Sequence, residues 1–304
     1  MDSKIIEEFK HICIICVLLL SAMLAPRIIA QQVGSPANID FHDGSGTMKG
    51  GPEIWPSAAL GSFMVGYTVV HNKYDHTRTF KPKKAVLKIK WLGHSSFQIT
   101  TSGGTIIVTD PIEFKGYHMP PNLSADIVTV SHEHPDHNCV DAVSGTPVVF
   151  RGTDKRLRTV NEIETTVKDV RLYTVPSFHD PGHHGVNAIF VFECDGIRIA
   201  HLGDIGTVLT DDQITATGGI DILMIPVGGQ FTIAAADADT IVNQLGVKRI
   251  VLPMHYKTEA FDDLPYSVEP FLAGKENIRR VDGSEFTVEI GAANGVREYI
   301  VLRY

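Results

Sequence analysis

The sequence predicts an α/β fold in which β-sheets pack against each other and helices lie outside them. Apolar runs of strand length follow one another along residues 86–253, and helical stretches are expected at about 234–245 and 268–272. Strands interleaved with helices are typical of such a layered sandwich. Segments that contain His and Asp follow directly after several of these runs, at the strand ends where a rigid scaffold presents functional groups.

The expected strands begin with an antiparallel meander, in which Ser102-Gly103-Gly104 forms a hairpin turn. A second hairpin turns at Asp195-Gly196. The strands expected along the chain are 86–91, 97–100, 105–109, 127–130, 171–175, 188–193, 197–201, 222–227 and 249–253. The last two are apolar runs typical of buried strands.

Composition and length bound the domain organisation. The chain has 304 residues, 43% of them hydrophobic and 20% charged, as expected for a globular protein with a substantial core. The folded domain is predicted to span residues 85–304. Residues 31–84 are rich in Gly, Pro, Ser and Asn and are interpreted as an irregular extension. Residues 1–30 are interpreted as a signal peptide.

The signal-peptide prediction rests on a nearly unbroken apolar run at residues 12–25. This run is too short to span a bilayer comfortably. It ends at Pro26, and Ile28-Ile29-Ala30 before Gln31 offers a cleavage site. We therefore expect export to the periplasm or the medium. A membrane anchor is the alternative if the segment is not cleaved.

Charge limits the classes of partner. The formal net charge is -8 and no Lys/Arg-rich stripe is evident, which argues against a nucleic-acid partner because phosphate backbones bind clustered cations. Membrane contact through the N-terminal segment is a second expectation. Apolar side chains within residues 54–70 could also touch a membrane if the substrate is a lipid, namely Ile54, Trp55, Leu60, Phe63, Met64 and Val65.

A metal-binding motif stands at residues 132–137, His-Glu-His-Pro-Asp-His, directly after the apolar run at 127–130. His132 and His134 are two positions apart, so on an extended backbone their side chains share one side. Asp136 and His137 follow around the turn and can face a second ion. The helical His-Glu-x-x-His motif does not apply, because its fifth position is an aspartate here and the proline would break the helix.

Three later residues complete a candidate ligand set. His179, Asp204 and His255 each follow an expected strand. Together with the motif they give seven imidazole and carboxylate ligands, enough for two divalent ions that share one carboxylate and one water. His183 and His184 stand close to His179 and are alternatives for its position.

Six further segments, together with the His-x-His-x-Asp-His signature, resemble the metallo-β-lactamase fold superfamily. The resemblance is closer to the branch that contains the ascorbate-6-phosphate lactonase and other zinc-dependent hydrolases. It covers about residues 86–304. The segments that carry it are Trp91–Phe97, Thr109-Asp110-Pro111, Phe178-His179-Asp180, His201-Leu202-Gly203-Asp204, Ile225–Gly229 and Pro253-Met254-His255-Tyr256.

This resemblance implies a four-layered αββα sandwich with the site at one edge of its two sheets. It also implies which residues hold which ion. His132, His134 and His179 would hold one ion, and Asp136, His137 and His255 the other. Asp204 would bridge both. The expected ions are two zinc ions, with manganese or iron as alternatives because His/Asp sites accept each of them.

Two further residues are candidates for the catalytic machinery beside Asp136, which is expected to accept a proton or to orient as a ligand. Asp110 either receives the second N–H of a metal-bound imidazole or caps its own turn. His94 either lines the site or is a histidine satisfied within the sheet edge.

The leading hypothesis is a metal-dependent hydrolase that uses a water or hydroxide bridged by two metal ions to cleave an ester, lactone or phosphoester in a small-molecule substrate. The Trp91-Leu92-Gly93-His94 segment also resembles N-acylphosphatidylethanolamine-hydrolysing enzymes, so a lipid phosphodiesterase is one alternative. A non-catalytic metal-binding protein is the other.

Overall fold

The computed structural model describes residues 85–156, 158–291 and 295–304. The predicted signal peptide and the extension at 31–84 lie outside these ranges. Within them, no helix is both long enough and apolar enough to cross a membrane.

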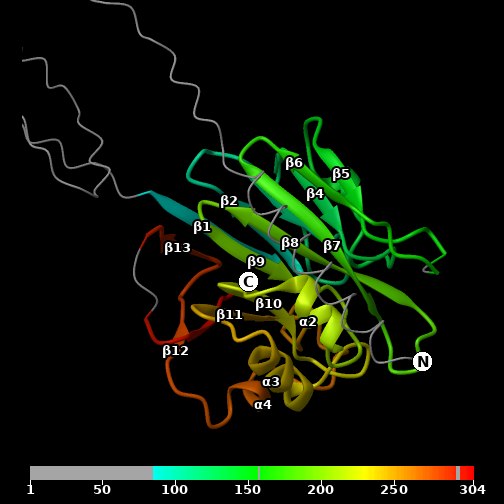
Figure 1. The fold of residues 1–304 in the computed structure, drawn as a ribbon, viewed down its shortest axis with the longest axis vertical. Helices are drawn as coiled ribbons and strands as arrows, with labels where there is room; N and C mark the ends of the chain where they lie inside the picture. Colours follow the sequence, from blue (N-terminus) through cyan, green and yellow to red (C-terminus); the bar gives the residue numbers. More distant parts are fainter. Residues whose placement is uncertain (1–84, 157, 292–294) are drawn as a thin grey trace, which may run out of the picture. The chain divides into compact units, whose positions relative to one another are not determined.

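Two β-sheets form the body of the domain (Figure 1). The first has six strands in the order β13-β1-β2-β3-β4-β5. Their bounds are β1 Val86–Gly93, β2 Ser96–Thr100, β3 Ile106–Thr109, β4 Ile127–Val130, β5 Val148–Arg151 and β13 Glu285–Glu289.

The second sheet has eight strands in the order β12-β14-β11-β10-β9-β8-β7-β6. Their bounds are β6 Glu164–Val167, β7 Val170–Phe178, β8 Val186–Cys194, β9 Ile197–His201, β10 Ile222–Pro226, β11 Ile250–Met254, β12 Ile278–Arg280 and β14 Glu298–Val301. Each of the nine expected strands corresponds to one of the strands in the two sheets.

The six-stranded sheet is buried on both faces. Ile107 and Ile127 are register partners in β3 and β4, and both belong to the main core between the sheets. Their neighbours Val108 and Val128 point to the opposite face, because side chains alternate along a strand. There they pack in a second apolar cluster with Tyr117 and others. That outer cluster is built largely from the chain between β3 and β5, in which the 3-10 turn Val140–Ala142 is the only helical element.

The helices gather against the eight-stranded sheet (Figure 1). They are α2 Asp211–Thr217, α3 Ala235–Gln244 and α4 Glu269–Leu272. From α3, the buried side chains Ala238, Ile241 and Val242 join the main core. The α/β sandwich is therefore confirmed. Among the described residues, the outer face of the six-stranded sheet is covered mostly by irregular chain together with the 3-10 turn Val140–Ala142.

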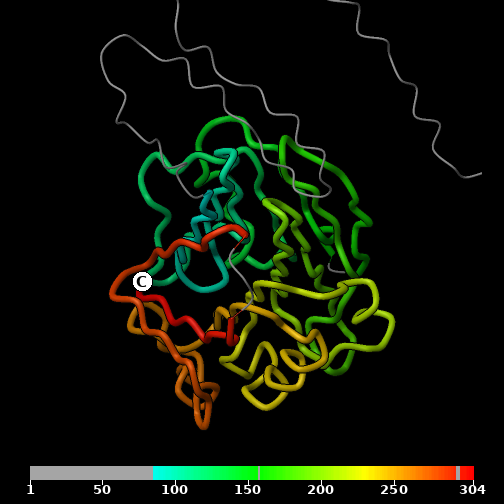
Figure 2. The backbone as a smooth tube through the Cα atoms, turned by 60° about the vertical axis from the view of Figure 1, so that its left-hand side comes forward, coloured from blue at the N-terminus to red at the C-terminus, as the bar shows by residue number. Residues whose placement is uncertain are grey.

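Segments from opposite ends of the domain pair at one edge of the six-stranded sheet. β13 runs antiparallel to β1, with Val86 opposite Glu289 and Lys90 opposite Glu285. Figure 2 shows the late, red-coloured chain lying beside the early, cyan-coloured chain. The edge strand β13, which pairs with β1, thus comes later in the sequence than all the candidate ligands.

Candidate metal centre

Strand direction brings the candidate ligands to a common edge. In the first sheet β1 and β3 both run antiparallel to β2, and β4 runs parallel to β3. Their ends therefore present His94, Asp110 and His132 on the same side. In the second sheet β7 and β9 both run antiparallel to β8, and β10 and β11 run parallel to β9. His179 and His255 follow β7 and β11 directly, and the loop after β9 carries Asp204.

The first cluster contains three imidazoles, those of His132, His134 and His179. Nε2 of His132 lies 3.0 Å from Nδ1 of His134. The ring of His179 is centred 4.8 Å from that of His132 and 4.7 Å from that of His134. Ligand atoms around one tetrahedral zinc ion are roughly 3.4 Å apart, given zinc–nitrogen bonds of about 2.0–2.1 Å. The spacing of these nitrogens therefore suits a single ion.

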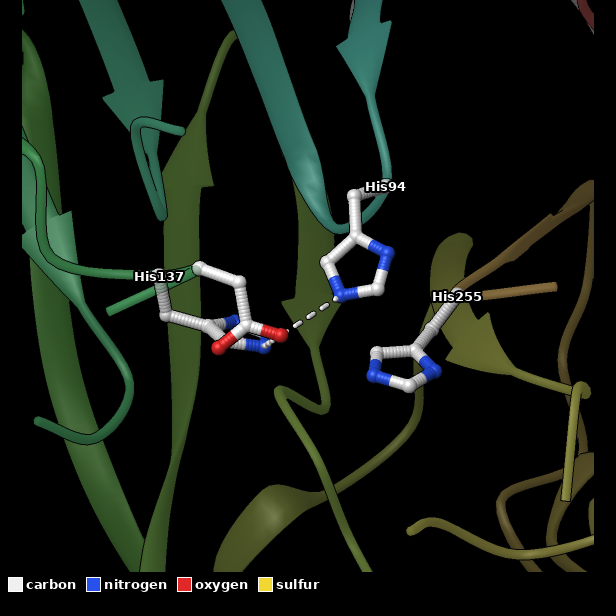
Figure 3. A group of neighbouring side chains, drawn as sticks. His94, His137 and His255 are labelled. Atoms are coloured by element: carbon white, nitrogen blue, oxygen red, sulfur yellow. Dashed lines mark ion pairs between the residues drawn. The ribbon is translucent and has the colours of Figure 1, made fainter. Parts of the chain in front are cut away.

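The second cluster contains His94, Asp136, His137 and His255. Oδ2 of Asp136 is 3.3 Å from Nε2 of His94 and 3.8 Å from Nε2 of His137. The rings of His94 and His255 are centred 4.0 Å apart. Figure 3 shows these three histidines arriving from separate segments and turning their rings toward one space, with the ion pair of His94 dashed. This is a four-residue cluster with three imidazoles and one carboxylate.

One oxygen of Asp204 lies between the two clusters. Its Oδ2 is 3.1 Å from Nε2 of His255 and 3.2 Å from Nε2 of His137. The same atom is 3.5 Å from Nε2 of His179 and 3.8 Å from Nε2 of His132. Two imidazoles from each cluster therefore face a single carboxylate oxygen, which is the arrangement expected of a ligand shared by two ions.

Three of these side chains come from residues whose backbone has a left-handed conformation, with a positive φ angle. The φ angles of His94, Asp110 and His255 are 51°, 40° and 48°. Each of these residues is the first after its strand, β1, β3 or β11. Non-glycine residues rarely adopt positive φ, and such positions cluster at functional sites because the surrounding structure must hold them there.

Unpartnered polar atoms test whether the cluster fits a metal. Among the described residues, both ring nitrogens of His94, Nε2 of His137 and of His179, Nδ1 of His255 and Oδ1 of Asp204 are buried without a hydrogen-bond partner. Buried polar groups normally have such partners. Convergent imidazole nitrogens and carboxylate oxygens are the ligands that zinc and similar ions take. The residues present therefore fit a metal centre.

The ionisation of the cluster agrees with this fit. Burial lowers the pKa of His94 to about 4 and the pKa of His132 well below its usual range, so both rings are neutral and can offer a lone pair. Burial opposes the charged form of Asp204, but His137 and His255 outweigh it and hold the pKa of this carboxyl well below its usual range. Burial likewise opposes the charged form of His137, yet Asp204 and Asp136 raise its pKa well above its usual range. The carboxylates thus create a strong preference for positive charge here.

Asp110 is positioned behind the ligands. Its Oδ2 lies 2.9 Å from Nδ1 of His137 and accepts a hydrogen bond of 2.5 Å from Oγ of Ser131. Oγ of Ser131 also lies 3.0 Å from Nδ1 of His132. One buried carboxylate therefore orients a histidine of the second cluster directly and a histidine of the first cluster through a hydroxyl group.

The structure brings most of the residues predicted from sequence into the metal centre and leaves two of them outside it. All seven predicted ligands converge on the two clusters, with Asp204 between them. His183 and His184 are solvent-exposed, and the ring of His183 stacks on Phe178 at 3.8 Å. The structure therefore brings His179, and neither alternative, into the first cluster. His94 lies in the second cluster, a place that its motif did not specify.

Sequence reasoning assigned no role to two buried polar residues near Asp204. Asn187, fully buried in β8, accepts a hydrogen bond of 3.0 Å from the backbone N–H of Asp204 and donates one of 2.8 Å to the carbonyl of Leu202. The fully buried His201 lies with Nε2 2.7 Å from the carbonyl oxygen of Ser95, which links the two sheets beneath the site. The only sequence signal for Asn187 was its position as a polar residue directly before the apolar run at 188–193.

A histidine and aspartate centre at the edge of two packed sheets defines a class of metal-dependent enzyme, and comparisons with known proteins identify the family. The model of the beta-lactamase superfamily domain matches residues 88–255, more than half of the chain. A UPF0173 metal-dependent hydrolase of Thermococcus kodakarensis is 31% identical over 199 residues, which cover 57% of this chain and 86% of the relative. Another, from Methanoculleus marisnigri, is 32% identical over 202 residues, which cover 61% and 87%.

A solved structure supports the same family. It is that of a proposed zinc-dependent hydrolase of the metallo-β-lactamase superfamily from Thermotoga maritima, with 35% identity and a TM-score of 0.58. The match covers 71% of this chain and 98% of that one. The chain belongs to the metallo-β-lactamase superfamily and is a metal-dependent hydrolase. Its place in the ascorbate-6-phosphate lactonase branch stays a prediction.

Proposed function

We propose that this hydrolase holds two divalent metal ions, zinc foremost, and cleaves an ester, a lactone or a phosphoester. The observation that carries the proposal is the position of Asp204 Oδ2, within 3.8 Å of imidazole nitrogens from both clusters. A carboxylate oxygen shared in this way favours two adjacent ions over one.

The proposed ligands follow the two clusters. His132, His134 and His179 hold one ion, while Asp136, His137 and His255 hold the other. When bound, two such ions polarise the scissile carbonyl or phosphoryl group and make a water molecule between them more acidic. The similarity to the proposed zinc-dependent hydrolase of Thermotoga maritima supports zinc. Manganese or iron would suit the same donor atoms.

Asp136 is the group best placed to move a proton. Its side chain is 22% exposed, whereas the side chains of His94 and Asp204 are 0% and 3% exposed. It also lines the cavity over the centre. In hydrolysis the water oxygen forms a bond to carbon or phosphorus, and the bond to the leaving oxygen breaks. Asp136 accepts the proton released by the water and returns it to that leaving oxygen.

Asp110 and His94, the other two catalytic candidates, contact the proposed metal ligands and do not line the cavity. Asp110 holds His137 and Ser131 and is fully buried on its side chain. His94 packs between Asp136 and His255 without reaching the cavity. We therefore assign Asp110 a positioning role and His94 a place beside the second ion.

Metal reconstitution tests the proposal. The purified chain, stripped with a chelator and then titrated with zinc, manganese or iron(II), should take up two ions per chain by elemental analysis. Hydrolysis of a simple ester, a lactone and a phosphodiester should be lost on stripping and recovered for at least one of them on loading. Uptake of a single ion, or activity that survives stripping, would refute the two-ion proposal. Cleavage restricted to N-acylphosphatidylethanolamine would favour the lipid phosphodiesterase alternative.

We also propose that the protein is exported and acts on a small molecule, without a nucleic-acid partner. The apolar run at residues 12–25 and the small residue before Gln31 support export. N-terminal sequencing of protein from its native host should give a mature terminus near Gln31. Intact Met1 on a membrane-bound form would show a retained anchor instead, and intact Met1 on soluble cytosolic protein would contradict export.

A further inference from the structure

A cavity of about 430 Å³ opens over the metal centre. His134, Asp136, His179, Asp204 and His255 line its polar side. Its remaining walls are dominated by three phenylalanines, Phe114, Phe231 and Phe261. The aromatic side chains are not needed to hold the metal ions. They therefore affect which substrates the cavity can bind.

The three phenylalanines come from three separate connections. Phe114 lies between β3 and β4, Phe231 between β10 and α3, and Phe261 between β11 and α4. The rings of Phe114 and Phe261 meet edge to face, with centroids 5.7 Å apart and planes at 74°. This geometry is the preferred one for aromatic pairs, so the two rings form a fixed wall. Phe261 is 7% exposed and also faces the ring of His94.

Phe231 behaves differently, because it is 51% exposed at the cavity. The chain on both sides of it is held. Its neighbour Gln230 has a φ of 62°, and Ile233 donates its backbone N–H to the carbonyl of Ile205 at 3.0 Å. The ring is thus kept in water by an anchored loop, although burying a phenylalanine side chain is favourable. A group that enters the cavity can therefore gain contact with this ring.

The charges at the rim favour an uncharged group in the outer part of the cavity. Lys115 is the only Lys or Arg among the described residues that line it. Nζ of Lys115 lies 2.7 Å from Oδ2 of Asp263, another lining residue. This lysine, alone among the described lining residues in carrying a positive charge, is therefore already paired with a carboxylate. A substrate with a second anionic group, such as a sugar phosphate, finds no free cation there.

We propose that the site selects substrates that carry an aromatic or similarly flat apolar group beside the scissile bond, packed against Phe231 and the Phe114–Phe261 wall. This inference rests on the proposed function, since the metal centre holds the reacting end. The apolar group supplies binding energy away from the reacting atoms, and its contact with three rings fixes the orientation of the scissile bond over the centre.

Three phosphonates test the proposal on the metal-loaded protein. Methylphosphonate and phenylphosphonate share the metal-binding head group and differ in the ring, while phosphonoacetate adds a second anion. Calorimetric titration should show phenylphosphonate binding on the order of 10-fold more tightly than methylphosphonate, as burial of part of a ring would give. Phosphonoacetate should show no advantage over methylphosphonate. Equal affinities for the phenyl and methyl compounds, or tightest binding of phosphonoacetate, would overturn the inference.

Substitution of Phe231 tests whether the aromatic side chains of the cavity cause the preference for the phenyl compound. Phe231→Ala should reduce the ratio of phenyl to methyl affinity several-fold, and Phe231→Leu should restore part of it. The exposed position of Phe231 makes loss of folding on substitution a small concern, whereas Phe261 is part of a packed cluster. Val148→Ala is the matched control, because Val148 is 46% exposed on β5 and does not line the cavity. An unchanged ratio in Phe231→Ala would contradict the assignment.

Metal content and hydrolysis of the same preparations separate this inference from the proposed function. Protein that loads two ions and hydrolyses esters without preferring the phenyl compound refutes the aromatic preference alone. Protein that prefers the phenyl compound but hydrolyses nothing refutes the proposed reaction alone.

Discussion

The carboxylate of Asp110 lies 2.9 Å from Nδ1 of His137, and both side chains are fully buried. This contact fixes which nitrogen of His137 faces the metal clusters, because the nitrogen that donates to Asp110 carries the proton. The same carboxylate reaches His132 through Ser131. Asp110 therefore controls the orientation of one histidine in each cluster.

Asp110→Asn should weaken metal binding and hydrolysis by about 10–100-fold, as is typical for outer partners of metal-bound histidines. The amide keeps the shape of the side chain but removes its charge. Competition with a chromophoric chelator measures the affinity. Asp282→Asn is a suitable control, because the side chain of Asp282 is 97% exposed and lies 3.7 Å from Arg303, away from the two clusters. Equal affinities in the two variants would show that Asp110 serves only the turn in which it lies.

Asp204→Ala should abolish hydrolysis and lower the affinity for at least one ion. The loss should exceed the roughly 100-fold upper range for outer partners, because Oδ2 of Asp204 lies within 3.8 Å of ring nitrogens from both clusters. Elemental analysis together with ester hydrolysis measures both effects. Retention of two ions with full activity would mean that the clusters bind independently of Asp204.

His179→Ala should empty the first cluster, since three imidazoles define it and the loss of one opens its coordination. His183→Ala and His184→Ala should leave the metal content unchanged, because both residues are exposed and belong to neither cluster. Metal content of the three purified variants decides the matter. Loss of metal from either exposed-histidine variant, with retention in His179→Ala, would reassign the ligand on this loop.

The thiol of Cys194 should resist alkylation in the folded protein. Burial raises its pKa to about 12, and the side chain is only 4% exposed. The reactive thiolate exists above the pKa, so at pH 8 only roughly one molecule in ten thousand carries it, compared with about a quarter for a free thiol. Iodoacetamide labelling with peptide mapping, before and after denaturation, measures the difference. Rapid native labelling of Cys194 would show that its strand opens readily.

Much of the fold could be predicted from sequence because the central strands are apolar runs. β10 and β11 are buried at every position. The strands that went unrecognised are short or polar at the edges. β6, for example, has the sequence ETTV with no fully buried residue. Such a strand is specified by its pairing with β7 more than by its own composition.

The helix α2 was missed although its sequence carries a start signal. Thr210 and Gln213 form a reciprocal capping box, in which each side chain accepts a hydrogen bond from the backbone of the other. A Thr-x-x-Gln pattern is a recognised helix N-terminus. The helix has only seven residues and buries only Thr217, so its apolar periodicity is too weak to be evident.

The convergence of the candidate ligands could be predicted because each is chemically distinctive and follows a strand. The position of His94 could not, since it depends on a left-handed backbone at the end of β1 and on the approach of β11 from the other sheet. The aromatic wall of the cavity could not be predicted from the sequence either. Phe114 and Phe261 meet only after two connections, 147 positions apart in the chain by their numbers, fold over the same site.

The candidate ligands come from both sheets, and this has a consequence for how the protein assembles. His132, His134 and His137 follow β4 of one sheet, whereas His179 and His255 follow β7 and β11 of the other. During synthesis, the centre stays incomplete until residue 255 has left the ribosome and both sheets have met. Full metal occupancy would therefore report that both sheets have assembled. A chain that terminates before residue 255, or whose strands pair wrongly, would fail to retain metal.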